Sequence, residues 1–160
     1  MRYILLTQSK RVTVDDEDYE RLALFKWYFH HTGYAVRNFT DSNKKRKTIF
    51  LHREVLGTPK GEYVDHKDCD KLNCQKDNLR PTTYANNNTN KFPQKNNTSG
   101  YKGVHQRETG KWRAYFTLKK KRTYIGQFET AIEAARAYNK AALEVWGEFA
   151  RLNVIDNASK

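Results

Sequence analysis

A polar segment at residues 89–99 divides this chain of 160 residues into two parts. It reads Thr-Asn-Lys-Phe-Pro-Gln-Lys-Asn-Asn-Thr-Ser, which offers almost no side chains to a hydrophobic core. Only 38% of the residues in the whole chain are hydrophobic, a low value for one well-filled core. We therefore expect two small folded modules joined by a linker at residues 91–98.

The balance of charge indicates a polyanionic partner. The chain carries 30 Lys and Arg residues against 18 Asp and Glu residues, a formal net charge of +12 at pH 7. A surplus of this size is typical of proteins that bind nucleic acid and, less often, anionic membranes. Because no stretch of about 18 apolar residues exists, a transmembrane helix is excluded and nucleic acid is the expected partner.

The N-terminus and the cysteines favour a cytoplasmic protein. Residues 1–8 are too short and too quickly polar for a signal peptide. Cys69 and Cys74 are too few for a disulfide framework, so we expect a reducing intracellular compartment. The sequence shows no dimerisation signature, and we expect a monomer without an obligate protein partner.

The first part of the chain combines strand and helix signals. Strands are expected at residues 3–6, 34–39 and 47–56. The acidic residues 15–18 favour the start of a short helix, because carboxylates stabilise a helix N-terminus. The polar residues 41–46 are expected to form a hairpin turn, where the basic residues 44–47 would touch backbone phosphate.

The second part of the chain predicts three strands followed by one helix. The strands are expected at residues 101–104, 112–118 and 122–126, with a basic turn at residues 119–121. Apolar residues then recur at helical spacing at Ala131, Ala135, Tyr138, Ala142 and Val145. The expected fold class is α+β, with a small three-stranded antiparallel sheet packed on one helix that ends at Gly147.

Residues 65–87 contain side chains suited to hydrolysis of a phosphodiester with one metal ion. The reaction needs an activated water, neutralised charge on the phosphate and a stabilised leaving oxygen. A hard divalent cation supplies the last two and prefers oxygen ligands. Asp65 offers a carboxylate and Asn87 an amide carbonyl, so these two are the candidate metal ligands.

A histidine and a second asparagine complete this set. His66 follows Asp65 on an extended chain, so it points to the opposite side and is placed to deprotonate the water. Asn78 can accept a hydrogen bond from the other ring nitrogen of His66 and thereby fix its tautomer. An alternative is a zinc site built from His66, Cys69 and Cys74, although no second ligand pair lies nearby.

The pattern Val-Asp-His…Asp-Asn-Leu-Arg…Asn over about residues 50–90 resembles the HNH endonucleases with the ββα-metal fold, in their phage and intron-encoded branch. The resemblance implies a nuclease module at residues 1–90, with its ββα-metal core at about 48–90. Mg2+ is the implied ion, with Mn2+ as a substitute. Cys69 stands where the family usually has a glycine, and Cys74 where an asparagine is common.

The same resemblance implies a role for each of the four polar residues. His66 would be the general base, Asp65 and Asn87 would bind the metal, and Asn78 would orient His66. Among neighbouring asparagines we choose Asn87, because its spacing from Asn78 fits the family.

His52 and Arg53 lie just before the expected active-site residues, and they have two interpretations. On the strand expected at residues 47–56, they would contact the scissile phosphate or its neighbours. Equally, His52 would be a strand histidine satisfied by hydrogen bonds. The sequence leaves both open.

Residues 99–154 resemble the Apetala-type, ethylene-response-factor-like DNA-binding domain. The resemblance rests on Ser-Gly-Tyr-Lys-Gly-Val at residue 99, Gly-Lys-Trp-Arg-Ala at residue 110 and Tyr-Ile-Gly-Gln-Phe-Glu-Thr at residue 124. In that family the sheet lies in the major groove of DNA and the helix supports it. The residues implied to face DNA are Lys102, His105, Arg107, Trp112, Arg113, Thr117 and Tyr124. For Trp112 the alternative is packing against the helix.

Together these features predict a metal-dependent DNA endonuclease of the homing type. It would nick double-stranded DNA as a monomer, and the resemblance to HNH endonucleases implies 5′-phosphate and 3′-hydroxyl ends. One alternative is a non-catalytic DNA-binding regulator with a degenerate nuclease module, and another is RNA binding through the basic sheet. The presence of all four catalytic candidates favours the nuclease.

Overall fold

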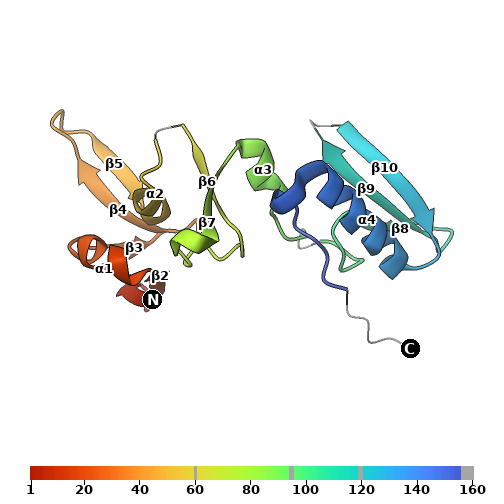
Figure 1. Ribbon diagram of the computed structural model, residues 1–160, viewed down its shortest axis with the longest axis horizontal. Helices are drawn as coiled ribbons and strands as arrows, with labels where there is room; N and C mark the ends of the chain where they lie inside the picture. Colours follow the sequence, from red (N-terminus) through yellow and green to blue (C-terminus); the bar gives the residue numbers. More distant parts are fainter. Residues whose placement is uncertain (60, 94–95, 119–120, 156–160) are drawn as a thin grey trace. The chain divides into compact units, whose positions relative to one another are not determined.

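The computed structural model describes residues 1–59, 61–93, 96–118 and 121–155, and it divides the chain into two compact units (Figure 1). The first unit comprises residues 1–87 and the second residues 88–160. Each unit contains a separate cluster of buried apolar side chains. Both units mix strands and helices, so the expected α+β class is confirmed.

The first unit contains three small antiparallel sheets. Its strands are β1 (Arg2–Leu5), β2 (Arg11–Val14), β3 (Tyr28–Phe29), β4 (Ala35–Thr40), β5 (Arg46–Phe50), β6 (Tyr63–His66) and β7 (Leu79–Thr82). They pair as β1-β2, β3-β4-β5 and β6-β7. Its helices are α1 (Asp16–Ala23), α2 (Leu51–Leu56), the 3-10 turn η1 (Lys76–Asn78) and α3 (Tyr84–Thr89). The hairpin around residues 41–46 is confirmed, whereas β2 and β3 were not expected.

The strand expected at residues 47–56 is wrong in its second half. The strand β5 ends at Phe50, and helix α2 follows at once. Leu51 and Val55, four residues apart, both point into the core with 0% and 5% of their surface exposed. Gly57 then ends the helix in the left-handed region at φ 60, where its N–H donates to Glu54 O. This helical spacing was present in the sequence and outweighs the strand propensity of the segment.

Strand β2 holds the loop between β6 and β7. Val12 and Val14 are fully buried, which fixes the strand in the core of the first unit. Between them, the Thr13 N–H donates to Leu72 O at 2.8 Å, and the Cys74 N–H donates to Thr13 O at 2.9 Å. The backbone of the loop is therefore anchored to the core close to His66.

The second unit is a three-stranded antiparallel sheet covered on one face by a long helix (Figure 1). The strands are β8 (Val104–Gln106), β9 (Trp112–Leu118) and β10 (Lys121–Phe128), and the helices are α4 (Ala131–Trp146) and the 3-10 turn η2 (Gly147–Phe149). Thr130 and Glu133 form a capping box that starts α4. These elements confirm the expected order of three strands and one helix.

The apolar stripe expected on this helix forms most of the contact with the sheet. Ala135, Tyr138 and Ala142 are buried, together with Ala134, which the stripe did not include. Val145 is 39% exposed and lies outside the core. In the described part of the chain, no helix combines the length and apolar character that crossing a membrane requires.

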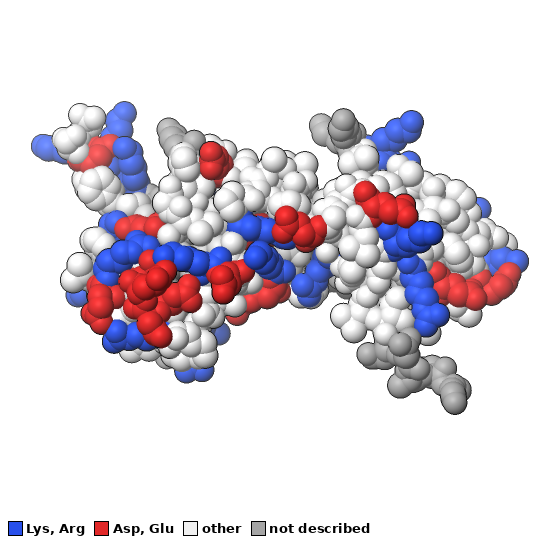
Figure 2. Space-filling model, viewed as in Figure 1, with Lys and Arg blue, Asp and Glu red and all other residues white. Residues whose placement is uncertain are grey.

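Basic side chains gather at the tip of the β4–β5 hairpin (Figure 2). Lys47 pairs with Asp41 at 2.8 Å, and Lys44 and Lys45 are exposed. The tip thus presents positive charge to solvent. The second basic turn, expected at residues 119–121, falls largely outside the described residues.

Candidate active site and nucleic-acid interface

The β6–β7 hairpin brings the acid and the histidine of the predicted site into the protein interior. Asp65 and His66 are only 4% and 5% exposed. Arg80 stands opposite Asp65 on β7, and its Nε and Nη2 donate to Asp65 Oδ2 at 2.9 and 2.7 Å. This charge-assisted pair fixes the orientation of the buried carboxylate.

The ring of His66 lies in an aromatic and thiol environment. Its centroid is 5.0 Å from that of His52 and 5.9 Å from that of Tyr34. Its Nε2 lies 3.8 Å from the sulfur of Cys74. Burial lowers the pKa of His66 and outweighs the opposing effect of Asp68, Asp65 and Asp70. The neutral imidazole, which a general base requires, is therefore favoured.

His52 does not lie where either interpretation placed it. It is on helix α2, and its side chain is 7% exposed between the rings of Tyr34, Phe50 and His66. Its Nδ1 is buried without a hydrogen-bond partner. Burial, and then the charges of His66 and Arg53, lower the pKa of His52 to about 3. His52 is thus a neutral packing partner of His66 rather than an exposed phosphate ligand.

Arg53 stabilises the loop that leads into β6. Its guanidinium donates to the carbonyl oxygens of Glu62 at 2.5 Å, Pro59 at 2.5 Å and Thr58 at 3.3 Å. These contacts differ from the expected phosphate contact, and they position the strand that carries Asp65.

Asn78 holds the loop between β6 and β7 rather than the imidazole itself. Its Nδ2 donates to Asp68 Oδ1 at 2.9 Å and to Asn73 O at 2.8 Å, and its Oδ1 accepts from the Asp68 N–H at 3.1 Å. Burial acts to raise the pKa of Asp68, but the hydrogen bonds from Asn73 and Asn78 outweigh it and lower that pKa. Asn78 therefore positions the residues that follow His66.

The candidate metal ligands come from two neighbouring elements. Asp65 is on β6, and the half-buried Asn87 is on α3, which follows the paired strand β7. A carboxylate and an amide carbonyl are hard oxygen donors, the ligand type that divalent cations such as Mg2+ prefer.

The zinc alternative finds no matching ligand cluster. Among the described residues, no three His, Cys, Asp or Glu side chains are grouped as a metal site. Cys69 occupies the left-handed region at φ 68, where the family usually has a glycine. Burial raises the pKa of the Cys74 thiol, which opposes the thiolate form that zinc requires.

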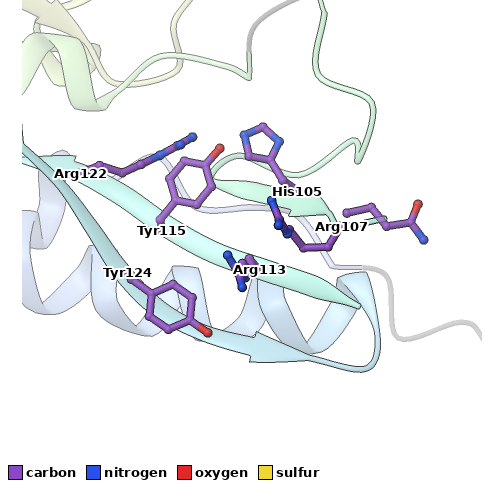
Figure 3. A pocket seen from close by; sticks show the side chains of 7 residues that line it. His105, Arg107, Arg113, Tyr115, Arg122 and Tyr124 are labelled. Atoms are coloured by element: carbon purple, nitrogen blue, oxygen red, sulfur yellow. The ribbon is translucent and has the colours of Figure 1, made fainter. Parts of the chain in front are cut away.

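The open face of the second unit's sheet is basic and aromatic. A hollow of about 490 Å³ on this face is lined by His105, Gln106, Arg107, Arg113, Tyr115, Arg122 and Tyr124 (Figure 3). The described residues that line it include no Asp or Glu. Positive charge beside exposed aromatic rings is the composition expected of a surface that binds nucleic acid.

Three side chains on this face form a stack. The rings of His105 and Tyr115 are 4.8 Å apart, and the guanidinium of Arg122 lies 3.5 Å from the centre of the Tyr115 ring (Figure 3). Burial, and then the charge of Arg122, lower the pKa of His105. Tyr115 was not among the candidates, although it alternates with the buried Ala114 along β9.

The remaining candidates of this unit divide between the two faces of the sheet. Arg113 hydrogen-bonds Gln127 on the open face at 3.2 Å, Thr117 is exposed opposite Arg122, and Tyr124 is 59% exposed. Trp112 packs against the core on the helix side, so its core interpretation applies. The ammonium of Lys102 donates to the carbonyl of Thr89, which binds this side chain within its own unit.

Two segments of the chain, one in each unit, match known protein families. Residues 52–89 match the HNH endonuclease family, and residues 99–148 match the AP2 domain. An uncharacterized HNH endonuclease of Acanthamoeba polyphaga mimivirus is 34% identical over 134 residues, which cover 82% of this chain and 68% of the viral protein.

Two plant proteins are also similar to part of this chain. The ethylene-responsive transcription factor ERN1 of Medicago truncatula is 47% identical over 66 residues, 40% of this chain and 25% of the plant protein. The dehydration-responsive element-binding protein 2A of Oryza sativa subsp. indica is 42% identical over 66 residues, again 40% of this chain and 24% of the regulator. The chain thus spans about a quarter of each of these two regulators.

Proposed function

This chain belongs to the HNH endonuclease family and carries an AP2 domain, and from this premise we propose that it is a metal-dependent DNA endonuclease. The observation that carries the proposal is the buried pair of Asp65 and His66 at the end of β6. A carboxylate held by Arg80 next to an imidazole whose neutral form is favoured offers a metal ligand and a general base, two groups that metal-assisted hydrolysis of a phosphodiester uses.

Asp65 and Asn87 would hold the metal ion, which we propose to be Mg2+ with Mn2+ as a substitute. When bound, such an ion neutralises charge on the scissile phosphate and stabilises the leaving oxygen. The Arg80 contacts fix one oxygen of the Asp65 carboxylate and orient the group. Arg80 also lowers the electrostatic cost of a carboxylate in the interior.

His66 would take the proton from the attacking water. Its neutral ring is favoured by burial, and the packed rings of His52 and Tyr34 restrict its motion. Asn78 would act on His66 indirectly, because it holds the loop that begins immediately after His66. The loop anchors to β2 add rigidity to the same segment.

The sheet of the second unit would bind double-stranded DNA through its open face. Arg107, Arg113 and Arg122 supply charge for phosphate or base edges, and Tyr124 supplies an exposed ring. The basic tip of the β4–β5 hairpin would add phosphate contacts in the first unit.

One catalytic set in each chain favours nicking by a monomer, with 5′-phosphate and 3′-hydroxyl products. We further propose that cleavage is site-specific and of the homing type, because a separate base-reading sheet accompanies the nuclease unit.

The experiment is the conversion of supercoiled plasmid that carries candidate target sites, in Mg2+, Mn2+ or EDTA. The intact chain should produce nicked circles with metal and none in EDTA. His66→Ala should lower the rate by about 10²–10⁴-fold while DNA affinity is retained, because a general base contributes about that much. His31→Ala, at an exposed histidine, is the matched control and should cleave normally.

Two results would contradict the proposal. Equal cleavage by His66→Ala would remove His66 from the role of base. No cleavage with any metal, with DNA still bound, would favour a non-catalytic DNA-binding regulator, the function that the names of the plant relatives describe.

A further inference from the structure

The neighbour of the His66 ring nitrogen is a cysteine rather than the asparagine that the sequence suggested. Cys74 Sγ lies 3.8 Å from His66 Nε2, a distance suited to a sulfur hydrogen bond. Both groups are buried, with Cys74 only 1% exposed. The amide of Asn78 meanwhile binds Asp68 and Asn73. Among these side chains, the thiol is therefore the group in contact with the ring nitrogen.

The second contact of the thiol determines which partner donates. Cys74 Sγ lies 3.9 Å from the carbonyl oxygen of Lys71, which can only accept a hydrogen bond. A single S–H proton directed to Lys71 O gives that carbonyl its donor. In that arrangement the sulfur lone pairs face His66 Nε2, and that nitrogen carries the proton of the N–H···S contact. Burial raises the pKa of the Cys74 thiol, so the S–H proton is retained.

The position of the sulfur is itself fixed by the fold. The Cys74 N–H donates to Thr13 O at 2.9 Å, and Thr13 lies on β2 between two fully buried valines. Thr13 and Asn73 also form a β-bridge. Backbone hydrogen bonds to this strand thus fix the position of Cys74. Its sulfur can therefore restrict the orientation of the His66 ring that contacts it.

We propose that Cys74 is a positioning residue that holds His66 as the Nε2–H tautomer, so that Nδ1 is the nitrogen that accepts the proton of the attacking water. The inference rests on the proposed function for the use of Nδ1. The part that concerns the ring itself, an N–H···S contact that selects one tautomer, is independent of catalysis. It assigns a role to a residue that the sequence analysis considered only as a zinc ligand.

The test is the tautomer of His66, measured by long-range proton–nitrogen NMR on the full chain labelled with 15N-histidine, in EDTA and without DNA. The His66→Gln spectrum identifies the His66 signals by their loss. The native chain should show a protonated Nε2 and an unprotonated Nδ1. Cys74→Ser keeps a donor and an acceptor at this place and should keep that tautomer. Cys74→Ala should show a mixture of both tautomers.

Cleavage of plasmid by the same variants provides the second measurement. Cys74→Ala should lose about tenfold in rate at saturating DNA, with unchanged DNA affinity, because groups that orient an active-site ligand typically contribute at least that much. Cys74→Ser should recover most of the rate. Cys69→Ala, at the half-buried cysteine of the same loop, is the matched control and should change neither the tautomer nor the rate.

The outcomes separate the two proposals. A native His66 with its proton on Nδ1, or a Cys74→Ala chain with the native tautomer, overturns the role of Cys74 whatever the cleavage result. A native Nε2–H tautomer in a chain that cuts no DNA leaves the contact standing and overturns the nuclease proposal. If Cys74→Ala fails to fold, the tautomer of the native chain and of Cys74→Ser still decides.

Discussion

The two units place their functional side chains in opposite environments. In the first unit, Asp65 and Arg80 form an ion pair whose side chains are 5% and 11% exposed. In the second unit, Lys111 and Glu129 form a pair whose side chains are 45% and 73% exposed. The open face of the sheet likewise presents Arg107 and Arg122 to solvent, and Arg113 is half-buried there.

This difference separates chemistry from binding. Buried charges require partners and a fixed geometry. Such an environment suits catalytic side chains, because they must be held in position against the scissile bond of the substrate. Exposed cations with few partners suit a polyanion, whose phosphates they neutralise in water.

The largest effect should come from the buried ion pair. Arg80→Ala leaves the Asp65 carboxylate in the interior without this partner, which should destabilise the first unit by on the order of 3–5 kcal/mol. Lys111→Ala removes an exposed pair and should cost less than about 1 kcal/mol. Urea unfolding of both variants measures the difference. Equal midpoints would mean that burial does not distinguish the two pairs.

A backbone position in the second unit should give the next largest effect. Gly103 has φ +74, and an added Cβ would lie 2.3 Å from the Tyr138 ring and 2.6 Å from Tyr115 O. Gly103→Ala should therefore lose the packing of the sheet on α4, together with DNA binding. Gly110 has φ +82 but open space around it, so Gly110→Ala should cost only about 1–2 kcal/mol of left-handed strain. Calorimetry and a DNA-binding assay on the two variants check this order.

The buried imidazole should make the first unit sensitive to acid. The pKa of His52 is about 3 in the folded chain, below its ordinary value of 6.5, so the unfolded chain binds the proton first as pH falls. The contribution of His52 to the free energy of unfolding is therefore fully present above pH 6.5. It decreases as the pH falls toward 3, by about 1.4 kcal/mol for each pH unit. His52→Phe keeps a ring beside Tyr34 and Phe50 and should flatten that part of the pH–stability curve.

The control for this experiment is the exposed histidine of the sheet. His105→Phe should leave the acid dependence of unfolding of the first unit unchanged, because His105 lies in the second unit. A native chain whose stability is constant between pH 6.5 and 4 would show that His52 is protonated in the fold.

The smallest effect should come from single charges on the open face. Arg122→Gln should weaken DNA binding by a few-fold and reduce the slope of log affinity against log salt by about one. Lys140→Gln removes the same charge from the exposed side of α4 and should leave the slope unchanged. Titrations at several salt concentrations measure both slopes. Equal slopes for the two variants would mean that the open face does not contact the phosphates.

Local patterns in the sequence were sufficient for the second unit. Alternation along β9 and the stripe from Ala135 to Ala142 depend only on spacing, and the sheet and helix formed as expected. The local sequence did not predict which face of the sheet Trp112 occupies, because an aromatic residue on a small sheet suits either face. Its packing beside Phe116 against α4 settled the choice.

The first unit was harder because its site is assembled from distant segments. The extended chain expected at Asp65 and His66 is strand β6, and the helix that carries Asn87 agrees with the ββα-metal core that the resemblance implies. The helix at Leu51–Leu56 replaced half of an expected strand, since burial of Leu51 and Val55 on one face outweighed local propensity. His52 consequently turned inward beside His66.

By itself, the sequence determined the two modules, the basic partner surface and the four polar residues of the proposed catalytic set. It did so because composition and spacing along one chain are local quantities. Only the tertiary structure decided which side chains meet: Arg80 with Asp65, His52 and Cys74 with His66, and Arg122 with Tyr115. These contacts join residues on different strands, helices or loops, and they form only when strand pairing and core packing bring those elements together.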